Sequence, residues 1–207
     1  MRNVIFDLGG VVFDWNPAEI IETFVARIDT DPMAQRGIAT QLKADVFSHP
    51  DWLETDRGTL SAADAVARFA ERMTLPIDTM QRLWDLCNVL MRPKLETVAL
   101  MDELFTQGAA LYCLSNMPVE RYAWLRQHHD LWHCFQGIVI SGEIQLIKPD
   151  AAIYQHLLQT FDLQAEECIF LDDSAPNVAA ANALGIHGIL FQDAASCRDD
   201  LFALFTQ

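Results

Sequence analysis

Short apolar runs recur along the chain and predict the strands of one sheet. The runs are NVIF at residues 3–6, ALYCL at 110–114, GIVI at 137–140, CIFL at 168–171 and GILF at 188–191. An apolar run without polar interruption is typical of a strand that is buried on both faces of a parallel sheet. We therefore expect five buried, parallel strands.

Helical patterns lie between the later strands. Apolar residues recur at helical spacing over residues 119–128, 151–161 and 177–184, and Gly185 is placed to end the last of these helices. Strands that alternate with helices in this way predict an α/β fold with a Rossmann-like, doubly wound parallel sheet and right-handed crossovers.

The segment between the first two strands, residues 7–109, carries helical patterns and hardly any strand signal. We expect helices over 18–28, 61–73, 78–90 and 94–107, with Ser61 as an N-cap and Gly108 at the end of the last helix. Pro17 and Pro93 mark the expected hinges. The sequence thus predicts an all-helical cap domain over residues 15–93, inserted into a catalytic core formed by residues 1–14 and 94–207.

Composition and charge narrow the class of protein. A chain of 207 residues with 51% hydrophobic content can bury the core of one domain that carries an insertion. The 14 basic and 29 acidic residues give a net charge of −15, which argues against a nucleic-acid or membrane partner. The N-terminal MRNVIFD has no signal-peptide pattern, and five scattered cysteines are expected to be reduced. We expect a cytoplasmic monomer or homodimer.

Polar residues follow four of the predicted strands. Ligand sites of open α/β sheets form beyond the carboxyl ends of the strands, so these side chains are expected to meet. Alone, each has an ordinary explanation as a turn, cap or surface residue. Together they offer carboxylates for a divalent cation, a nucleophile and donors for an anion. In chain order they are Asp7, Ser115, Asn116, Lys148, Asp172 and Asp173.

The segments that contain these residues resemble the haloacid dehalogenase-like hydrolases. IFDLGGVVF, LYCLSN, IKPDAAIY and IFLDDSAPNVAAANALGI match the family's four motifs in order, and the insertion matches its helical C1-type cap. The resemblance implies that Asp7 attacks phosphorus and forms an aspartyl-phosphate, which water then hydrolyses. It also implies a Mg²⁺ site at Asp7, the carbonyl of Gly9 and the acidic pair Asp172 and Asp173.

Elementary electrostatics supports these roles. A carboxylate approaches a phosphate dianion only where positive charge offsets their repulsion, and Lys148 and Mg²⁺ provide that charge. The hydroxyl of Ser115 can bond a phosphate oxygen, and Asn116 is expected to contact the substrate. The N–H groups of Gly9 and Gly10 can approach closely because no Cβ intervenes.

Position 9 departs from the family's usual phosphatase pattern, which has a second aspartate two residues after the nucleophile. That group protonates the leaving oxygen, and such general acid–base help is worth about 10²–10⁴ in rate. One interpretation is that another side chain replaces it. A second is that the leaving group needs little protonation, and a third is that the chain is a 2-haloacid dehalogenase. The candidate replacements are Asp14, His49, Asp51, Asp56 and Arg57.

We favour the second interpretation. FDLGGVV followed later by LDD is similar to the branch that includes glucose 1-phosphate phosphatases, which implies a small phosphorylated metabolite such as an anomeric sugar phosphate. The family's dehalogenases usually have a tyrosine where Gly9 stands and no acidic pair such as Asp172 and Asp173. A non-catalytic phosphosugar-binding protein is a further alternative, but it has no need of the nucleophilic Asp7.

Several other residues are candidates for contact with the substrate. Trp15 follows the nucleophile loop and Trp52 lies in the expected cap, so their aromatic faces would suit the apolar face of a sugar. Arg57 or Arg92 would hold a second anionic group, although a solvated surface position is the simpler interpretation of each.

Overall fold

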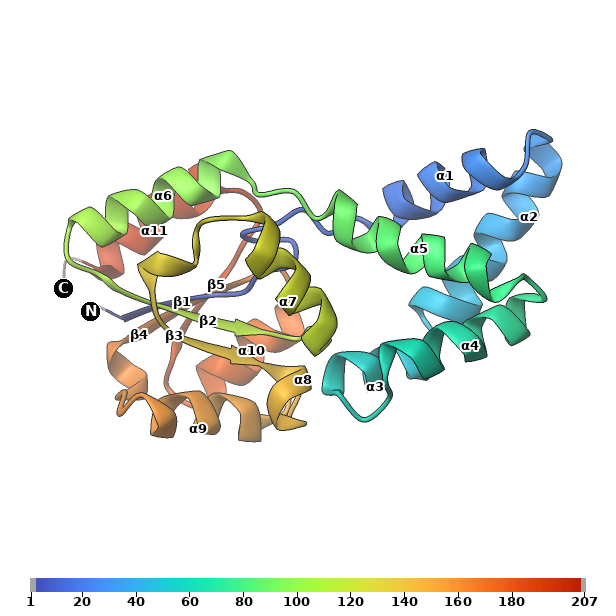
Figure 1. The fold of residues 1–207 in the computed structure, drawn as a ribbon. Coiled ribbons are helices and arrows are strands. Elements are labelled where there is room, and N and C mark those ends of the chain that lie inside the picture. Colours follow the sequence, from blue (N-terminus) through green and yellow to red (C-terminus); the bar gives the residue numbers. More distant parts are fainter. Residues whose placement is uncertain (1–2, 206–207) are drawn as a thin grey trace.

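A computed structural model describes residues 3–205 and contains a five-stranded parallel sheet in the order β3-β2-β1-β4-β5 (Figure 1). The ends of the expected core, residues 1–2 and 206–207, lie outside the described residues. The Rossmann-like α/β fold predicted from the sequence is confirmed. The strands are β1 (Asn3–Phe6), β2 (Ala110–Ser115), β3 (Phe135–Ile140), β4 (Cys168–Asp172) and β5 (His187–Leu190).

Helices cover both faces of the sheet. Side chains alternate along a strand, so Val4 and Phe6 join one hydrophobic cluster while Ile5 joins the other. The first cluster lies under α6 (Leu95–Thr106) and α11 (Ala194–Phe205), and the second lies under α9 (Ala151–Thr160) and α10 (Ala175–Ala183) (Figure 1). This double cover explains the uninterrupted apolar runs of the inner strands.

The last strand differs from the prediction. GILF was expected to be buried on both faces, but β5 is half-buried along most of its length and the side chain of Leu190 is 45% exposed. The reason is its place at the edge of the sheet, where β4 is its one hydrogen-bonded neighbour. An apolar run reports burial less reliably at an edge than in the middle of a sheet.

The insertion between β1 and β2 is helical, as expected. The predicted helices correspond to α1 (Pro17–Ile28), α4 (Ala62–Met73) and α5 (Ile77–Leu90), and the Ser61 hydroxyl accepts a hydrogen bond of 3.1 Å from the Asp64 amide as the N-cap of α4. The prediction missed α2 (Pro32–Leu42), a π-helical turn (Lys43–Phe47) and α3 (Pro50–Arg57). In α2 only Leu42 is buried, so its sequence carries little amphipathic signal.

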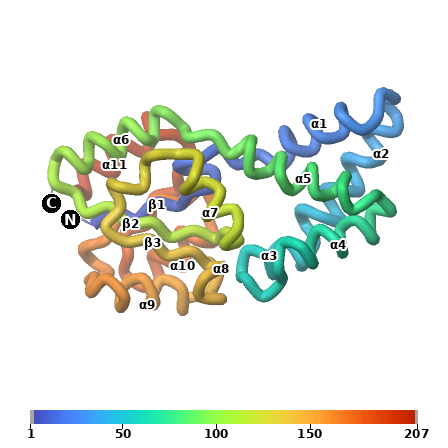
Figure 2. Tube along the Cα trace, viewed as in Figure 1, coloured from blue at the N-terminus to red at the C-terminus, as the bar shows by residue number. Residues whose placement is uncertain are grey.

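The insertion has a hydrophobic cluster of its own, built around Phe24, Trp52, Phe69 and Leu83. The chain passes between this lobe and the core at two crossings, which lie side by side in Figure 2. The crossings are hydrogen-bonded to each other, from the Asp14 amide to the Arg92 carbonyl and from the Lys94 amide to the Val12 carbonyl, both at 2.8 Å. Of the two expected hinge prolines, Pro93 lies within a crossing, whereas Pro17 begins α1. The division at residues 14/15 and 93/94 stays a prediction.

A second contact joins the two lobes away from these crossings. The end of α3 packs against α8 (Ser141–Ile144) of the core. There the buried Ser141 hydroxyl donates to the Asp56 carbonyl and accepts a hydrogen bond from the Met117 amide at 2.8 Å. Gly58 has φ +81°, and a Cβ there would lie 2.3 Å from the Gly142 carbonyl oxygen. The backbones of the two lobes therefore touch.

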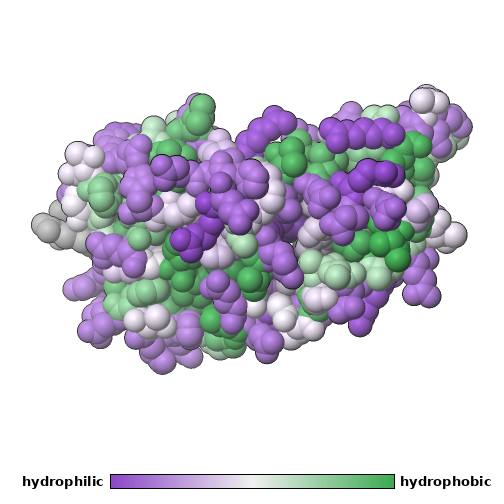
Figure 3. Space-filling view, viewed as in Figure 1, coloured by the Kyte–Doolittle hydropathy of each residue, from purple (hydrophilic) through white to green (hydrophobic). Residues whose placement is uncertain are grey.

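Hydrophilic side chains cover much of both lobes in the view of Figure 3, in keeping with the net charge of −15. Within residues 3–205, no helix is long and apolar enough to cross a membrane. All five cysteines are buried and free of disulfides.

Substitution of Gly58 by alanine is expected to lower the free energy of unfolding by more than about 1–2 kcal/mol, the cost of a left-handed non-glycine residue, because the new methyl group also meets the Gly142 backbone. The matched control is Gly108→Ala, since Gly108 has φ +87° but open space around its Cβ position. Chemical denaturation measures both variants. Equal losses would contradict a close contact between the lobes.

Candidate active site

The strand ends bring the predicted site residues together. Asp7 follows β1, Asp172 ends β4, and Lys148 lies in the loop after α8. The Lys148 Nζ lies 2.9 Å from Asp7 Oδ1 and 2.7 Å from Asp172 Oδ2. One ammonium group thus links the carboxylates of two neighbouring strands.

Lys148 is buried and fully bonded. Its side chain donates a third hydrogen bond of 2.9 Å to the Leu114 carbonyl, which satisfies the three N–H groups of the ammonium. Burial alone would lower the pKa of Lys148, but the charges of Asp7 and Asp172 outweigh it and raise that pKa. Lys148 therefore stays charged in the interior.

The acidic pair divides into an inner and an outer carboxylate. Asp172 is fully buried and accepts hydrogen bonds from the Ser174 amide at 2.8 Å and from Asn177 Nδ2 at 3.0 Å, besides its contact with Lys148. Asp173 is exposed and lines a cavity. Asp172 thus anchors Lys148, and Asp173 faces the ligand space.

The donor set of Asp7, Asp172 and Asp173 fits a divalent cation. Each offers a carboxylate oxygen, and the three oxygens lie within 4.8 Å of one another. Burial raises the pKa of Asp7 to about 7 against the opposing charge of Lys148, and burial together with the charge of Asp172 raises the pKa of Asp173. A cation among these oxygens would remove their mutual repulsion and favour the ionised forms.

Of the two glycines that follow Asp7, only Gly10 is required by its backbone conformation and its surroundings. Gly10 has φ +78°, and a Cβ there would lie 2.1 Å from Asp173 Oδ2, so this position requires glycine. At Gly9 a Cβ would meet only Trp15, at 3.5 Å, which is an ordinary contact. A Cβ would therefore fit at position 9, and lack of space for this atom does not explain why the carboxyl group is missing there.

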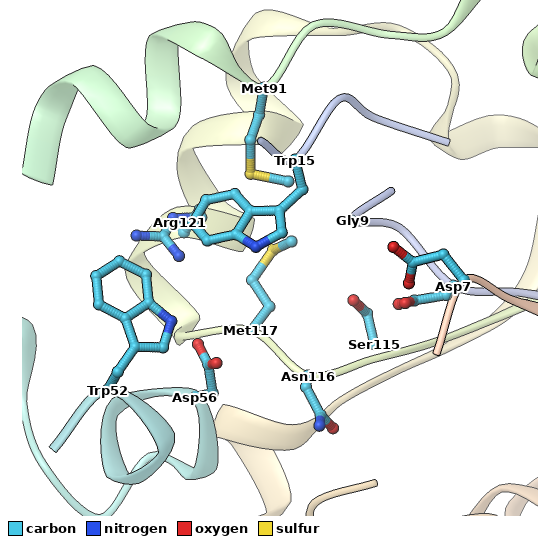
Figure 4. A pocket seen from close by; sticks show the side chains of 11 residues that line it. Asp7, Gly9, Trp15, Trp52, Asp56, Met91, Ser115, Asn116, Met117 and Arg121 are labelled. Atoms are coloured by element: carbon cyan, nitrogen blue, oxygen red, sulfur yellow. The ribbon is translucent and has the colours of Figure 1, made fainter. Parts of the chain in front are cut away.

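A cavity of about 170 Å³ opens beside Asp7, between the core and the inserted lobe (Figure 4). Its core wall includes the Ser115 hydroxyl, which lies next to Asp7, while Trp52 and Asp56 enter from α3 of the cap. Its lining residues are Asp7, Gly9, Trp15, Trp52, Asp56, Met91, Ser115, Asn116, Met117, Arg121 and Asp173.

Comparison with known proteins identifies the family. The profile of the haloacid dehalogenase-like hydrolases matches residues 1–185. The chain belongs to this family. This hydrolase is 32% identical over 199 residues to the sesquiterpene phosphatase astK of Aspergillus oryzae, covering 96% of this chain and 94% of that protein.

Two solved structures share the fold of this hydrolase. A HAD-like family hydrolase from Porphyromonas gingivalis is 21% identical, with a TM-score of 0.80 over 100% of this chain and 98% of that one. A HAD family enzyme from Bacteroides thetaiotaomicron, in complex with magnesium and inorganic phosphate, is 20% identical, with a TM-score of 0.74 over 93% and 94% of the two chains.

Asn116 of the hydrolase has a role that the sequence did not indicate. Its side-chain amide donates to the Lys148 carbonyl at 2.9 Å, and its Oδ1 accepts from the Lys148 amide at 2.8 Å. Both halves of the amide therefore fix the backbone that carries Lys148. Asn116 also lines the cavity. Its contact with the substrate stays a prediction.

The predicted aromatic pair does lie at the cavity. The Trp15 and Trp52 rings are 5.8 Å apart between centroids, and both residues line it (Figure 4). Arg121 of α7 (Val119–His128) lies beside both rings, with its guanidinium carbon 5.2 Å from the Trp15 ring centroid and 5.3 Å from that of Trp52. The two rings therefore pack against a cation.

Arg121 was missed by the sequence interpretation. It is 2% exposed, its Nε donates to Asn88 Oδ1 at 3.0 Å, and its Nη2 has no hydrogen-bond partner among the described residues. The sequence feature that could have revealed the burial of Arg121 is its spacing of four residues from the apolar Leu125, which places both side chains on the buried face of α7.

The arginines that were predicted to hold a second anion do not reach the cavity. Arg57 lies 3.8 Å from both Glu54 and Asp150 in ion pairs, and Arg92 is exposed beside the hinge. Neither residue lines the cavity.

The five candidate replacements for the missing acid separate clearly. Asp14 is exposed, His49 accepts a hydrogen bond from the Asp51 amide at the start of α3, and Asp51 pairs with Arg72 at 2.6 Å. None of these three residues lines the cavity, and neither does Arg57. Asp56 is the one candidate of the five that lines the cavity.

Replacement of Lys148 by methionine is expected to lower the free energy of unfolding by about 3–5 kcal/mol at neutral pH, because the buried Asp7 and Asp172 lose their counter-charge. Urea denaturation measures the loss in metal-free buffer. The exposed Lys43 provides the control, and Lys43→Met should change stability by less than about 0.5 kcal/mol. Equal stability of the two variants would contradict the assigned role of Lys148.

Proposed function

We propose that this hydrolase is a Mg²⁺-dependent phosphomonoesterase that works through an aspartyl-phosphate at Asp7. The observation that carries the proposal is the Asp7 carboxylate, held by a buried ammonium at the wall of a cavity beside Ser115 and Asp173. Similarity to the Aspergillus oryzae phosphatase supports phosphate ester hydrolysis as the reaction. The complex of the Bacteroides enzyme with magnesium and phosphate supports Mg²⁺ as the ion.

Each residue has a defined part in the reaction. The Asp7 carboxylate forms an O–P bond as the bond from phosphorus to the leaving oxygen breaks, and a water oxygen later replaces Asp7 on phosphorus. The Ser115 hydroxyl donates to a phosphate oxygen, and Lys148 supplies fixed positive charge. Asp7, Asp173 and the Gly9 carbonyl would hold Mg²⁺, which offsets the repulsion between carboxylate and phosphate.

The cavity favours a small substrate. Its volume of about 170 Å³ is below the roughly 300–1,000 Å³ of pockets for drug-sized ligands. A compact polar group fits this space better than a sesquiterpene chain does. We therefore do not propose a sesquiterpene phosphate as the substrate of this hydrolase. We propose a sugar phosphate, with 1-phosphates included, because Trp15 and Trp52 line the cavity with aromatic surface and Arg121 offers N–H donors.

The haloacid dehalogenase alternative is less favourable on electrostatic grounds. Release of halide from a site with the clustered carboxylates of Asp7, Asp172 and Asp173 would add negative charge where, among the described residues, Lys148 is the one cation in an ion pair with these acids. The same cluster suits a phosphate that arrives with a divalent cation.

We expect phosphate release from sugar 1-phosphates and 6-phosphates in the presence of Mg²⁺, measured against a panel of acyl, hydroxy-acid and nucleoside phosphates. Asp7→Asn should abolish turnover because an amide is a poor nucleophile, whereas Asp14→Asn, at an exposed site outside the cavity, should keep it. Turnover by the Asp7 variant would contradict the mechanism. Preference for non-sugar phosphates would contradict the substrate class alone.

Metal binding should be visible without turnover. Mg²⁺ added to the EDTA-treated protein should raise the melting temperature, because a ligand that binds only the folded state stabilises it. Asp173→Asn should reduce that shift, since Asp173 supplies one of the clustered oxygens. An equal shift in the wild type and in the variant would place the cation elsewhere.

A further inference from the structure

We propose that Asp56, which the cap supplies, is the general acid that protonates the leaving oxygen in place of the carboxyl group absent at Gly9. The inference rests on the proposed phosphatase reaction and adds a catalytic residue to it. It follows from the position of Asp56 in the cavity, from the contacts that fix its backbone and from its surroundings.

Asp56 lies on the side of the cavity where the leaving group departs. In the view of Figure 4, Asp7 and Asp56 lie on opposite sides of Ser115. In phosphoryl transfer the attacking and leaving oxygens lie roughly in line through phosphorus. A phosphate held between Asp7 and Ser115 therefore directs its leaving oxygen away from Asp7, toward the cap. Among the residues that line the cavity, Asp56 is the carboxyl group that comes from the cap.

The backbone of Asp56 is fixed relative to the core. Its carbonyl accepts a hydrogen bond from the Ser141 hydroxyl, and Ser141 is itself fully buried and bonded to the Met117 amide. Two residues later, Gly58 touches the backbone of Gly142. These contacts hold the end of α3 against the core, so the acid has a defined position when the cap is closed. A proton donor needs this precision to reach the leaving oxygen.

The surroundings of Asp56 favour a protonated carboxyl group. Burial raises the pKa of Asp56 to about 7, although the nearby Arg121 of α7 and Lys148 of the core favour its charged form, and the charge of Asp7 adds to the increase. Asp56 forms no ion pair within 4 Å among the described residues. A carboxyl group in these surroundings can both release and recover a proton near neutral pH.

The proton balance of the reaction closes on Asp56. As the Asp7 oxygen bonds to phosphorus, the bond to the leaving oxygen breaks, and that oxygen takes the proton of Asp56 to give a neutral alcohol. The Asp56 carboxylate then takes a proton from water as the water oxygen bonds to phosphorus and the bond to Asp7 breaks. Phosphate leaves and Asp56 is protonated again. Ordinary alcohol phosphates thereby become substrates, so a preference for anomeric phosphates does not follow from Gly9 alone.

The test compares two leaving groups in Asp56→Asn. With the best alcohol phosphate of the panel, the variant should lose about 10²–10⁴ in kcat, the usual contribution of a general acid. With acetyl phosphate, whose carboxylate leaves without a proton, the first turnover should stay close to the wild-type rate. The phosphoenzyme should then accumulate, because Asp56 no longer activates water. Asp78→Asn, at an exposed aspartate on α5 of the cap, serves as the matched control and should leave both substrates unchanged.

A pH profile gives a second readout. Wild-type turnover of the alcohol phosphate should fall as pH rises and Asp56 loses its proton, and this limb should be absent in Asp56→Asn. An unchanged rate on the alcohol phosphate would overturn the proposal, and so would an equal loss in the first turnover of both substrates. Failure of the phosphatase reaction itself is distinguishable, because the wild type would then release no phosphate from either substrate.

Discussion

The ion pairs of Lys148 are the interaction on which the site depends. Lys148 is 3% exposed and its ammonium joins Asp7 to Asp172, so two acidic strand ends can lie side by side in the interior. Lys148 opposes the effect of burial, which raises the pKa of Asp7, and a protonated Asp7 is no nucleophile. The surrounding residues serve this arrangement: Asn116 fixes the backbone of Lys148, Asn177 and Ser174 hold Asp172, and the absence of a Cβ at Gly10 makes room for Asp173.

The inserted lobe completes a site whose charges the core supplies. Trp52 and Asp56 enter the cavity from α3, and Arg121 extends from the core into the aromatic cluster of the cap. The two hydrogen-bonded crossings join the lobes at one end of this interface, and the contact of Ser141 with Asp56 joins them at the other. The core thus provides the nucleophile and the cation site, while the cap provides the walls that a substrate would meet and the proposed acid.

The sheet and its chemical groups could be predicted because both are encoded locally. Uninterrupted apolar runs located all five strands, and the polar residue after a run marks the edge of the sheet where sites form. What escaped prediction depends on packing between elements. The burial of Arg121 requires the tryptophans of another lobe, and α2 carries little apolar pattern because it covers the outside of the cap. The choice of Asp56 among five candidates likewise required the position of α3.

Trapping of the covalent intermediate tests the central claim most directly. The protein would be quenched in acid during turnover of a ³²P-labelled substrate with Mg²⁺, digested, and the labelled peptide identified. The account predicts a hydroxylamine-sensitive acyl phosphate on Asp7, and no label in Asp7→Asn. A hydroxylamine-resistant label on Ser115, or turnover without any labelled protein in the wild type and in Asp56→Asn alike, would contradict it.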